Sequence, residues 1–452
     1  MDWSGERSTV TRREVLRVAG AGSIAGLAGC SGGSSRTTPT STATQYANQP
    51  VGADRVTFGF TLPQSGPFSP VGDPQQRGFK LAVKHLNGGG AWVGTEEWAA
   101  LSGDGLLGRT VESAVADTGS SAETARSAAE RLIDQDGAVM IAGGGSTNTG
   151  RALLDYCPSR GVVHMLGFAP GTSSTGSDCS RYGFQEMHNS RMAADALAPV
   201  VTERFGKDIS YYQLHADTDF GVTQAEQFDR RLESAGWNGM GSAETRVGTK
   251  DFRPQLKEAT TADSDVVVLS YHGRDAATVL DQATEELSEE TGIVMPIVTR
   301  ELARSAGASM TGVVGTIPWD HRVDAPLSAA FTDAFENAYV GDQIRLPSGQ
   351  ARLAYAQTLQ YAAAVERAGT FEPPAVIREL EDTTYQAGLG EATLRACDHQ
   401  SIRPVPVVEG PQEGPAVLDL VQVSSDVSYG CSEAPANECT DLGPYEPETT
   451  DS

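Results

Sequence analysis

The chain has 452 residues, which exceeds one ordinary domain core and suits two folded lobes with tails. Its 39% hydrophobic content is that of a globular protein, and its formal net charge of -25 argues against nucleic acid as a partner. The carboxylates are spread along the whole chain, and only five of the 34 basic residues are lysine. This pattern is typical of a halophilic protein, because salt at about 1 M shortens the Debye length to about 3 Å and screens carboxylate repulsion.

The first 30 residues predict an export signal. Residues 11–16, TRREVL, resemble the twin-arginine export motif, and the apolar run at 18–28 is too short and too rich in Gly and Ala to span a bilayer stably. The sequence LAGC at 27–30 resembles a lipobox, which implies a lipid on Cys30 that anchors the protein to the outer face of the cell membrane. Residues 31–53 are rich in Ser and Thr with few apolar side chains, so we expect a flexible tether there.

The stretch 55–90 predicts a strand, a loop and a helix. Residues 55–62 are rich in β-branched and aromatic side chains and indicate a buried strand, while 63–72 has the composition of a turn. The helix is expected to begin with Asp73 as N-cap and Pro74 at its first position. Such a loop places N–H groups and a hydroxyl where open α/β sheets bind ligands, although ordinary βα turns have the same form.

The sequence of residues 62–90, LPQSGPFSPVGDPQQRGFKLAVKHLNGGG, resembles the first strand–helix unit of the leucine/isoleucine/valine-binding proteins. These are type I periplasmic solute-binding proteins of ABC importers. The resemblance extends over about residues 55–410 and implies an α/β fold of two doubly wound, Rossmann-like lobes. A three-strand hinge would join the lobes and let them close on a small solute. It also implies that Ser65 contacts the ligand and that Val71 packs against the ligand side chain.

Strands and helices alternate over the rest of the chain, which predicts parallel sheets covered by helices. For the first lobe we expect strands at 110–116, 138–142 and 162–167 and a helix at 121–135. For the second lobe we expect helices at 193–205, 220–235 and 275–287 and strands at 209–214, 265–270 and 295–299. The segment 312–317, the helices 327–339 and 351–368, and the segment 398–408 resemble the family's later crossings between the lobes.

The resemblance also divides the chain into parts. These are lobe 1 at 54–190 and 316–392, lobe 2 at 191–315 and 393–410, and an acidic, cysteine-containing tail at 411–452.

In the first lobe, residues 143–148, GGGSTN, follow a predicted strand and open a helix. Glycines let a ligand approach the backbone, and the free N–H groups of a helix N-terminus suit an anion. A glycine-rich turn with a serine N-cap is the alternative. The resemblance implies that Ser146 and Thr147 hold the ligand α-carboxylate. It also implies contacts from the next loop through Ala169, Gly171 and Thr172, where the residues depart from the family pattern.

In the second lobe, residues 215–221, HADTDFG, resemble the family loop whose aromatic residue covers the ligand, here Phe220. We expect Asp219 to be a helix N-cap, which explains this loop better than a metal site does. His272 stands where amino-acid-binding members have an aromatic tyrosine. Glu301 stands where a glutamate pairs with the ligand α-ammonium, and a carboxylate facing a helix N-terminus across a cleft suits a zwitterion. A solvated loop acid is the alternative for Glu301.

Five cysteines follow the lipobox. We expect a bridge between Cys157 and Cys179, which would contribute about 3 kcal/mol in the chain-entropy model. Cys431 and Cys439 are expected to pair in the tail and to leave Cys397 free, although the sequence equally allows Cys397 to pair with either tail cysteine. The spacing matches no zinc signature.

Catalytic and cofactor signatures are missing from the sequence, which has no Gly-x-Ser-x-Gly elbow, phosphate loop or His-Glu-x-x-His. We therefore expect no enzyme, no cofactor and no metal. The resemblance implies an extracytoplasmic, lipid-anchored binding protein that delivers its solute to ABC permease subunits. The expected ligand is an apolar or branched amino acid, or an amide or urea if Glu301 is not engaged. A sensory binding protein of the same fold and an exported hydrolase are the alternatives.

Overall fold

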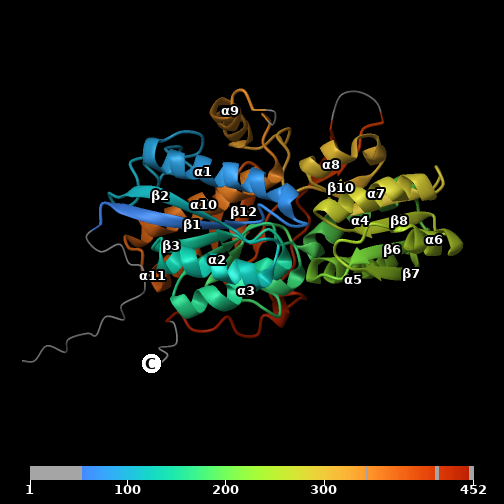
Figure 1. The fold of residues 1–452 in the computed structure, drawn as a ribbon, viewed down its shortest axis with the longest axis horizontal. Coiled ribbons are helices and arrows are strands. Elements are labelled where there is room, and N and C mark those ends of the chain that lie inside the picture. Colours follow the sequence, from blue (N-terminus) through green and yellow to red (C-terminus); the bar gives the residue numbers. More distant parts are fainter. Residues whose placement is uncertain (1–52, 343–344, 413–416, 447–452) are drawn as a thin grey trace, which may run out of the picture. The chain divides into compact units, whose positions relative to one another are not determined.

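A five-stranded parallel sheet forms the first lobe of the computed structural model, which describes residues 53–342, 345–412 and 417–446 (Figure 1). The predicted export signal, Cys30 and nearly all of the tether therefore lie outside the described residues. The strands in spatial order are β2 (Thr110–Asp117), β1 (Arg55–Leu62), β3 (Ala138–Gly143), β4 (Val163–Leu166) and β5 (Gly183–Gln185). Strand β3 is buried at every position, as a central parallel strand should be.

Helices cover both faces of this sheet. On one face, α1 (Gly72–Gly88) packs against α10 (Gly349–Ala368), and on the other α2 (Ala122–Asp134) packs against α3 (Thr147–Tyr156). Helix α10 is buried without interruption from Gly349 to Val365, which places it at the centre of the lobe. Helices α9 (Ser328–Ala338) and α11 (Pro373–Leu380) and a small antiparallel sheet complete the lobe, and that sheet consists of β11 (Thr383–Gln386), β12 (Glu391–Leu394) and β13 (Ser401–Ile402).

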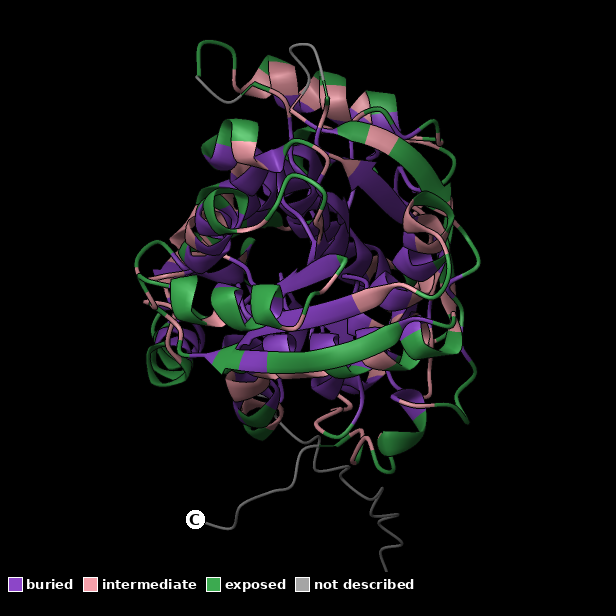
Figure 2. Cartoon of the chain, turned by 90° about the vertical axis from the view of Figure 1, so that its right-hand side faces the viewer, coloured by how far each residue is buried: buried purple, intermediate pink, exposed green. Residues whose placement is uncertain are grey.

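A seven-stranded sheet forms the second lobe. Its spatial order is β15 (Asp419–Ser424), β14 (Val405–Glu409), β10 (Val314–Thr316), β9 (Gly292–Ile297), β8 (Val266–Ser270), β6 (Ser210–Ala216) and β7 (Asn238–Thr245). The five strands from β10 to β7 are parallel, whereas β14 pairs antiparallel with β10 and β15 pairs antiparallel with β14. Part of the segment predicted as a tail thus adds an edge strand to this sheet. Figure 2 shows buried strands in the middle of the sheet and exposed ribbon at its edges.

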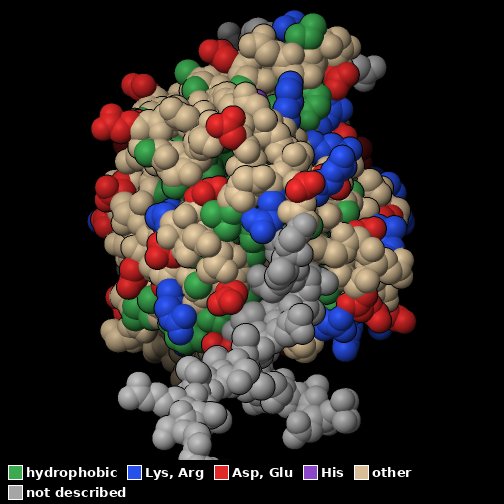
Figure 3. Space-filling view, turned by 90° about the vertical axis from the view of Figure 1, so that its left-hand side faces the viewer, with side chains coloured by type: hydrophobic (Ala, Val, Ile, Leu, Met, Phe, Trp, Pro, Cys, Tyr) green, Lys and Arg blue, Asp and Glu red, His purple; other side chains and the backbone are tan. Residues whose placement is uncertain are grey.

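The helices of the second lobe also lie on both faces. Helices α4 (Ser190–Phe205) and α5 (Asp219–Ser234) share one apolar cluster with the sheet, while α6 (Arg253–Thr261), α7 (Arg274–Glu286) and α8 (Arg300–Ala306) share another. No helix among the described residues is long and apolar enough to cross a bilayer. On the first-lobe face in Figure 3, acidic side chains lie interspersed with basic ones.

The strands and helices predicted from the alternation are confirmed, but two predicted helix caps are wrong. Helix α1 has Val71 and not Asp73 as its N-cap, because the helix begins at Gly72, two residues earlier than predicted. A Cβ at Gly72 would lie 2.1 Å from the carbonyl oxygen of Pro63, so the close turn requires glycine. Helix α5 has Thr218 and not Asp219 as its N-cap, since the Thr218 hydroxyl accepts from the Gly221 N–H at 3.1 Å.

Buried charged residues lie where the chain crosses between the lobes. The crossings are at 186–189, 317–327 and 403–404. In the first, Glu186 is fully buried and forms ion pairs with Arg352 of α10 and with Arg403 of the third crossing. Arg403 also donates to the carbonyl of Pro318 in the second crossing, at 2.9 Å. Burial lowers the pKa of Arg403 to about 10, against the opposing charge of Glu186.

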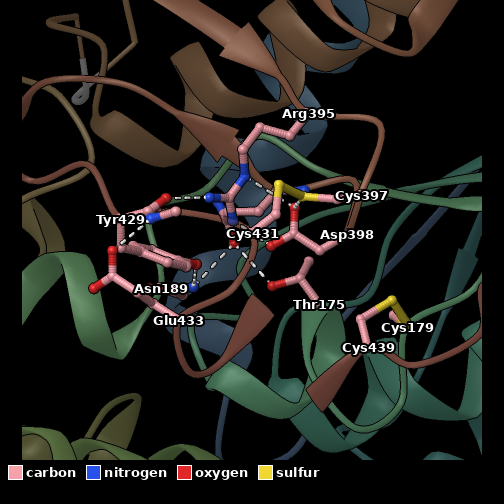
Figure 4. A network of polar contacts seen from close by, with 12 residues as sticks. Thr175, Cys179, Asn189, Arg395, Cys397, Asp398, Tyr429, Cys431, Glu433 and Cys439 are labelled. Atoms are coloured by element: carbon pink, nitrogen blue, oxygen red, sulfur yellow. Dashed lines mark hydrogen bonds and ion pairs between the residues drawn. A yellow bond between two sulfur atoms is a disulfide. The ribbon is translucent and has the colours of Figure 1, made fainter. Parts of the chain in front are cut away.

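The predicted pairings of Cys157 with Cys179 and of Cys431 with Cys439 are wrong, whereas the pairing of Cys397 with a tail cysteine, which the sequence left open, is confirmed. Cys179 pairs with Cys439, and Cys397 pairs with Cys431 (Figure 4). Cys157 is unpaired and fully buried among the side chains of α2 and α3, where burial raises the pKa of its thiol. Each tail cysteine pairs with a cysteine that is close in space but distant in sequence, at separations of 260 and 34 residues. The predicted pairs were chosen because they close short loops, and for this reason they were wrong.

Candidate ligand-binding site

The loop after β1 and the loop after β8 bring the two lobes into direct contact. The N–H of Arg274 donates to the carbonyl of Pro67 at 3.0 Å, and the Arg274 guanidinium donates to the Ser69 hydroxyl at 3.1 Å. Gly273 has φ +69°, and a Cβ there would lie 2.6 Å from the Pro67 oxygen. Glycine is therefore required for this approach of one backbone to the other.

Four aromatic rings from both lobes meet behind this contact, and we call them the aromatic cluster. The imidazole of His272 stacks on Phe68 with ring centroids 4.3 Å apart and meets Phe220 edge to face at 5.2 Å. Phe168 completes the set at 6.1 Å from His272. Burial lowers the pKa of His272 to about 4, so the imidazole is neutral at pH 7. Its Nε2 atom is buried and has no hydrogen-bond partner among the described residues.

An apolar wall extends from the aromatic cluster. Val71 is buried and packs in one group with Phe168 and Phe220, to which Ile297 of β9 and Leu353 of α10 also belong. The structure therefore brings together three of the predicted site residues, Val71, Phe220 and His272. This wall is built from both lobes, so its burial depends on their contact.

A cavity of about 200 Å³ lies between the lobes beside Val71. Val71 and Pro70 line it from the first lobe, and α7 and α8 line it from the second through Gly273, Arg274, Ala277, Thr299, Leu302 and Ser305. Drug-sized ligands occupy pockets of about 300–1,000 Å³, so this space suits a smaller solute.

Glu301 lies in the first turn of α8, between Thr299 and Leu302, which both line this cavity. Helix α8 begins there because the Thr299 hydroxyl caps it, accepting from the Leu302 N–H at 3.0 Å. Burial raises the pKa of the Glu301 carboxyl, while the Ser348 hydroxyl from the first lobe and Arg304 oppose the rise. Its Oε2 atom is buried without a hydrogen-bond partner among the described residues. A buried carboxyl of this kind is stabilised by a cationic or hydrogen-bond-donating ligand.

Ser146 and Thr147 use their hydroxyls within the first lobe. Ser146 is the N-cap of α3 and forms a capping box with Thr149, in which each side chain accepts from the other's N–H, at 3.3 and 3.1 Å. The Thr147 hydroxyl accepts from the Gly171 N–H at 3.0 Å. The glycines before them are also needed for packing, since a Cβ at Gly143 would lie 1.9 Å from the carbonyl of Thr61. The Ser146 and Thr147 hydroxyls are thus engaged within the first lobe, as in the alternative of a glycine-rich turn with a serine N-cap. An anion at this place would be held by backbone N–H groups.

The loop after β4 contacts both lobes. Ala169 packs inside the first lobe with Leu154 and Leu166. Gly171 lies against the carboxyl of Asp219 in α5, and the Thr172 N–H donates to the Thr223 hydroxyl at 3.5 Å. Burial raises the pKa of Asp219, opposed by Ser173 and Arg151. Gly171 and Thr172 therefore lie at the contact between lobes, and Ala169 does not.

Ser65 is exposed and lies apart from the other predicted site residues. Its hydroxyl donates to the carboxylate of Asp117 at 2.6 Å, and that carboxylate also accepts from the Gln64 N–H at 2.8 Å. These bonds lower the pKa of Asp117 against the opposing effect of burial. Ser65 thus fixes the loop to the end of β2.

Sequence reasoning missed Phe68, Phe168, Ser348 and Arg274. Phe68 and Phe168 stand in the loops that follow β1 and β4. An aromatic residue among turn-forming residues is the signal in the sequence that could have identified them. Ser348 gave no signal in the sequence, because it is the residue before α10 and only the tertiary fold brings it close to Glu301. The described residues hold no group of three or more His, Cys, Asp or Glu side chains that could bind a metal ion.

Comparison with known proteins yields one family and many related structures. The family model described as periplasmic binding protein matches residues 55–415. The leucine-, isoleucine-, valine-, threonine- and alanine-binding protein of Pseudomonas aeruginosa is 23% identical over 76% of this chain and 87% of its own length. An amino acid ABC transporter substrate-binding protein from Pseudomonas fluorescens Pf-5 superposes with a TM-score of 0.75 at 21% identity, over 85% of this chain and 99% of its own. The branched-chain amino acid transporter substrate-binding protein LivJ of Streptococcus pneumoniae, solved with isoleucine, gives 0.68 at 19% identity, over 81% and 99%.

Proposed function

The chain belongs to the periplasmic binding protein family, and from this premise we propose that it is the substrate-binding lipoprotein of an ABC importer. Its ligand is an amino acid with an apolar side chain, enclosed between the two lobes. The family is one of solute-binding proteins with an extracytoplasmic location. In this proposal the chain carries out no bond chemistry and works through different affinities of its open and closed forms.

The observation that carries the proposal is the buried carboxyl of Glu301 in α8, the helix whose Leu302 and Ser305 line a small apolar cavity between the lobes. An α-ammonium group would supply the cation that this carboxyl lacks. Backbone N–H groups at the N-terminus of α3 are suited to the α-carboxylate. Val71 and the aromatic cluster supply the apolar surface for the side chain.

The relatives support the same ligand class. The Pseudomonas aeruginosa protein is named for leucine, isoleucine, valine, threonine and alanine, and the Streptococcus pneumoniae protein was solved with isoleucine. We extend this class to the present chain, with preference for the apolar members because the described wall is apolar.

Export and anchoring are part of the proposal. The motif at 11–16 supports twin-arginine export, and LAGC at 27–30 supports a lipid on Cys30. The partner is then a pair of ABC permease subunits in the same membrane. Replacing Cys30 in a Cys30→Ser variant is expected to release the protein into the medium, whereas a variant that stays with the membrane would contradict lipid anchoring.

We also propose that the protein works in concentrated salt. The net charge of -25 and the scarcity of lysine support this. The melting temperature is expected to rise between 0.2 and about 2 M KCl as carboxylate repulsion is screened.

Thermal unfolding of residues 31–452 in about 1 M salt tests the ligand class. The screen contains leucine, isoleucine, valine, alanine, short amides, urea and small carboxylic acids. A ligand at one hundred times its dissociation constant adds about 2.7 kcal/mol of stability, which is readable as a shift in melting temperature. A shift with apolar amino acids supports the proposal. A shift only with amides or carboxylic acids would remove Glu301 as a partner of the ammonium, and no shift with any of them would contradict the proposed ligand class.

A further inference from the structure

The C-terminal segment at residues 425–446, which we call the strap, continues from β15 and contacts both lobes and the hinge (Figure 4). Its attachments fall into three groups, of which the first two overlap between Val427 and Ala436 and the third follows from Cys439 to Tyr445. The first group joins it to the second lobe, the next to the crossings, and the last to the first lobe.

The strap is attached to the second lobe by apolar packing and by one arginine. Val427, Tyr429 and Ala436 are buried in the apolar cluster that contains α4. Arg191 of α4 donates to the carbonyl of Ala434 at 3.0 Å, and its guanidinium lies over the ring of Tyr429 at 5.3 Å. This part of the strap therefore moves with the second lobe.

The strap is attached to the hinge through Tyr429 and Cys431. Asn189, in the first crossing, donates to the Tyr429 hydroxyl at 2.7 Å. Arg395, in the first-lobe loop between β12 and β13 that precedes the third crossing, donates to the backbone carbonyl of Tyr429. The disulfide between Cys397 of the same loop and Cys431 lies beside this contact. Figure 4 shows Asn189, Tyr429, Arg395 and the Cys397–Cys431 disulfide close together.

The end of the strap is attached to the first lobe. The Cys179–Cys439 disulfide joins it to the loop that precedes β5. The Arg181 N–H donates to the carbonyl of Leu442 at 2.6 Å. The ring of Tyr445 lies under the guanidinium of Arg181 at 4.3 Å, and its hydroxyl donates to Glu381 at 2.6 Å.

The second-lobe attachment at Ala436 and the first-lobe disulfide at Cys439 are only three positions apart. Residues Ala436–Glu438 form a single turn of 3-10 helix, which rises about 2 Å per residue and so spans about 6 Å. Three fully extended residues reach about 10 Å. The strap can therefore lengthen by only about 4 Å before its buried anchors or its disulfide must give way.

We propose that the strap is a fourth connection between the lobes and limits how far they separate. This inference rests on the proposed function only in assuming that the lobes open and close. A limit on opening increases the fraction of unliganded molecules that are closed or nearly closed. The apparent affinity for a ligand that binds the closed form rises with this fraction. It also leaves the cleft side, where Arg274 meets Pro67, as the place where opening begins.

Lengthening the strap tests this inference without breaking either disulfide. Four residues, Gly-Ser-Gly-Ser, are inserted between Glu438 and Cys439, which adds up to about 13 Å of reach. The same insertion after Gly341, an exposed glycine of the first lobe, is the matched control. The measurement is amide hydrogen exchange of the unliganded protein over residues 271–276. There the N–H of Arg274, at the start of α7, has Pro67 of the other lobe as its acceptor.

The lengthened strap is expected to speed exchange over 271–276 about fivefold or more, while the control insertion leaves it unchanged. Unchanged exchange in helix α2 confirms that the fold is intact. A C179S/C439S/C397S/C431S variant, which also removes the link from the strap to the loop between β12 and β13, gives a second test and is expected to act in the same direction. Wild-type exchange over 271–276 in both variants, with α2 protected, would overturn the proposal. Because no ligand is present, the result is independent of which solute the cleft binds.

Discussion

Two buried carboxylates, Glu186 in the hinge and Glu301 in the cleft, have different electrostatic surroundings. Glu186 is fully buried and faces two guanidinium groups, those of Arg352 and Arg403. Glu301 also has a buried oxygen, but its nearest cations, Arg304 and Arg300, belong to its own helix and form no ion pair with it within 4.0 Å among the described residues. A charge matched within the chain stabilises the fold, whereas an unmatched one lowers stability and is available to a ligand.

The largest effect is expected where the matched charge is broken. An Arg352→Met variant leaves Glu186 buried with only the more distant Arg403, whose Nε lies 3.9 Å away. The loss in free energy of unfolding is expected to be about 3–5 kcal/mol, the scale of an uncompensated buried charge. Chemical denaturation of the unliganded protein measures it.

The Glu301→Gln variant is the counterpart in the cleft. Its unliganded stability should stay equal to that of the wild type or rise, because a neutral amide replaces a carboxyl whose pKa is already raised by burial. A Glu301→Gln loss as large as the Arg352→Met loss would show that the two carboxylates do not differ in the way described.

A smaller effect is expected from the aromatic cluster as the pH falls. The pKa of His272 is lowered from 6.5 to about 4, so the unfolded chain binds the proton first. Stability from this group is complete above pH 6.5 and is lost progressively as the pH falls from 6.5 toward 4. Between pH 7.5 and pH 5 this amounts to about 2 kcal/mol.

A His272→Phe variant keeps the stacked ring and removes the titration. Chemical denaturation at the two pH values should therefore show a smaller loss for the variant. His85 and His164 also have pKa values lowered to about 4 and contribute the same trend to both proteins. Equal losses in the two proteins would mean that His272 is accessible to water and not closed between the lobes.

The smallest effect is expected at the N-terminus of α3. A Ser146→Ala variant removes the capping box and should lower the free energy of unfolding by about 1 kcal/mol. Its effect on ligand affinity should be smaller than that of Glu301→Gln, because backbone N–H donors remain. The matched Ser65→Ala variant, at an exposed loop residue, should change stability by less than about 0.5 kcal/mol. A larger affinity loss at Ser146 than at Glu301 would mean that the ligand is held mainly as an anion.

The lobes were predictable from the sequence because local patterns determine them. Buried parallel strands such as 138–142 appear as short apolar runs, and helices such as α2 show apolar residues at helical spacing. Strand β7 was missed because it is an exposed edge strand whose residues, NGMGSAET, carry no apolar alternation. The cap of α5 was off by one residue because Thr218 and its neighbour Asp219 are both good N-cap residues. The cap of α1 was off by two residues because Val71 forms no side-chain cap hydrogen bond and so gives no signal in the sequence.

The cleft and the strap were predictable only in part. Resemblance pointed to Val71, Phe220 and His272, which do meet, but not to Phe68, which stands in the same loop as Val71 and stacks on His272. The partners of the cysteines depend on how residues 425–446 lie against both lobes, and nothing local in the sequence encodes that path. The ion pairs of Glu186 likewise join residues more than 160 positions apart, so only the fold brings them together.

The pairing of Glu301 with a ligand ammonium is tested most directly by a thermodynamic cycle of two ligands and two proteins. Titration calorimetry compares the amino acid of largest thermal shift with the same molecule lacking its amino group, on the wild type and on Glu301→Gln. The wild type should prefer the amino acid by about 2–3 kcal/mol, and the variant should lose most of this preference. Glu289→Gln, at an exposed carboxylate of the same lobe, should keep it. An equal preference in the wild type and Glu301→Gln would contradict the account, because the ammonium would then be held elsewhere.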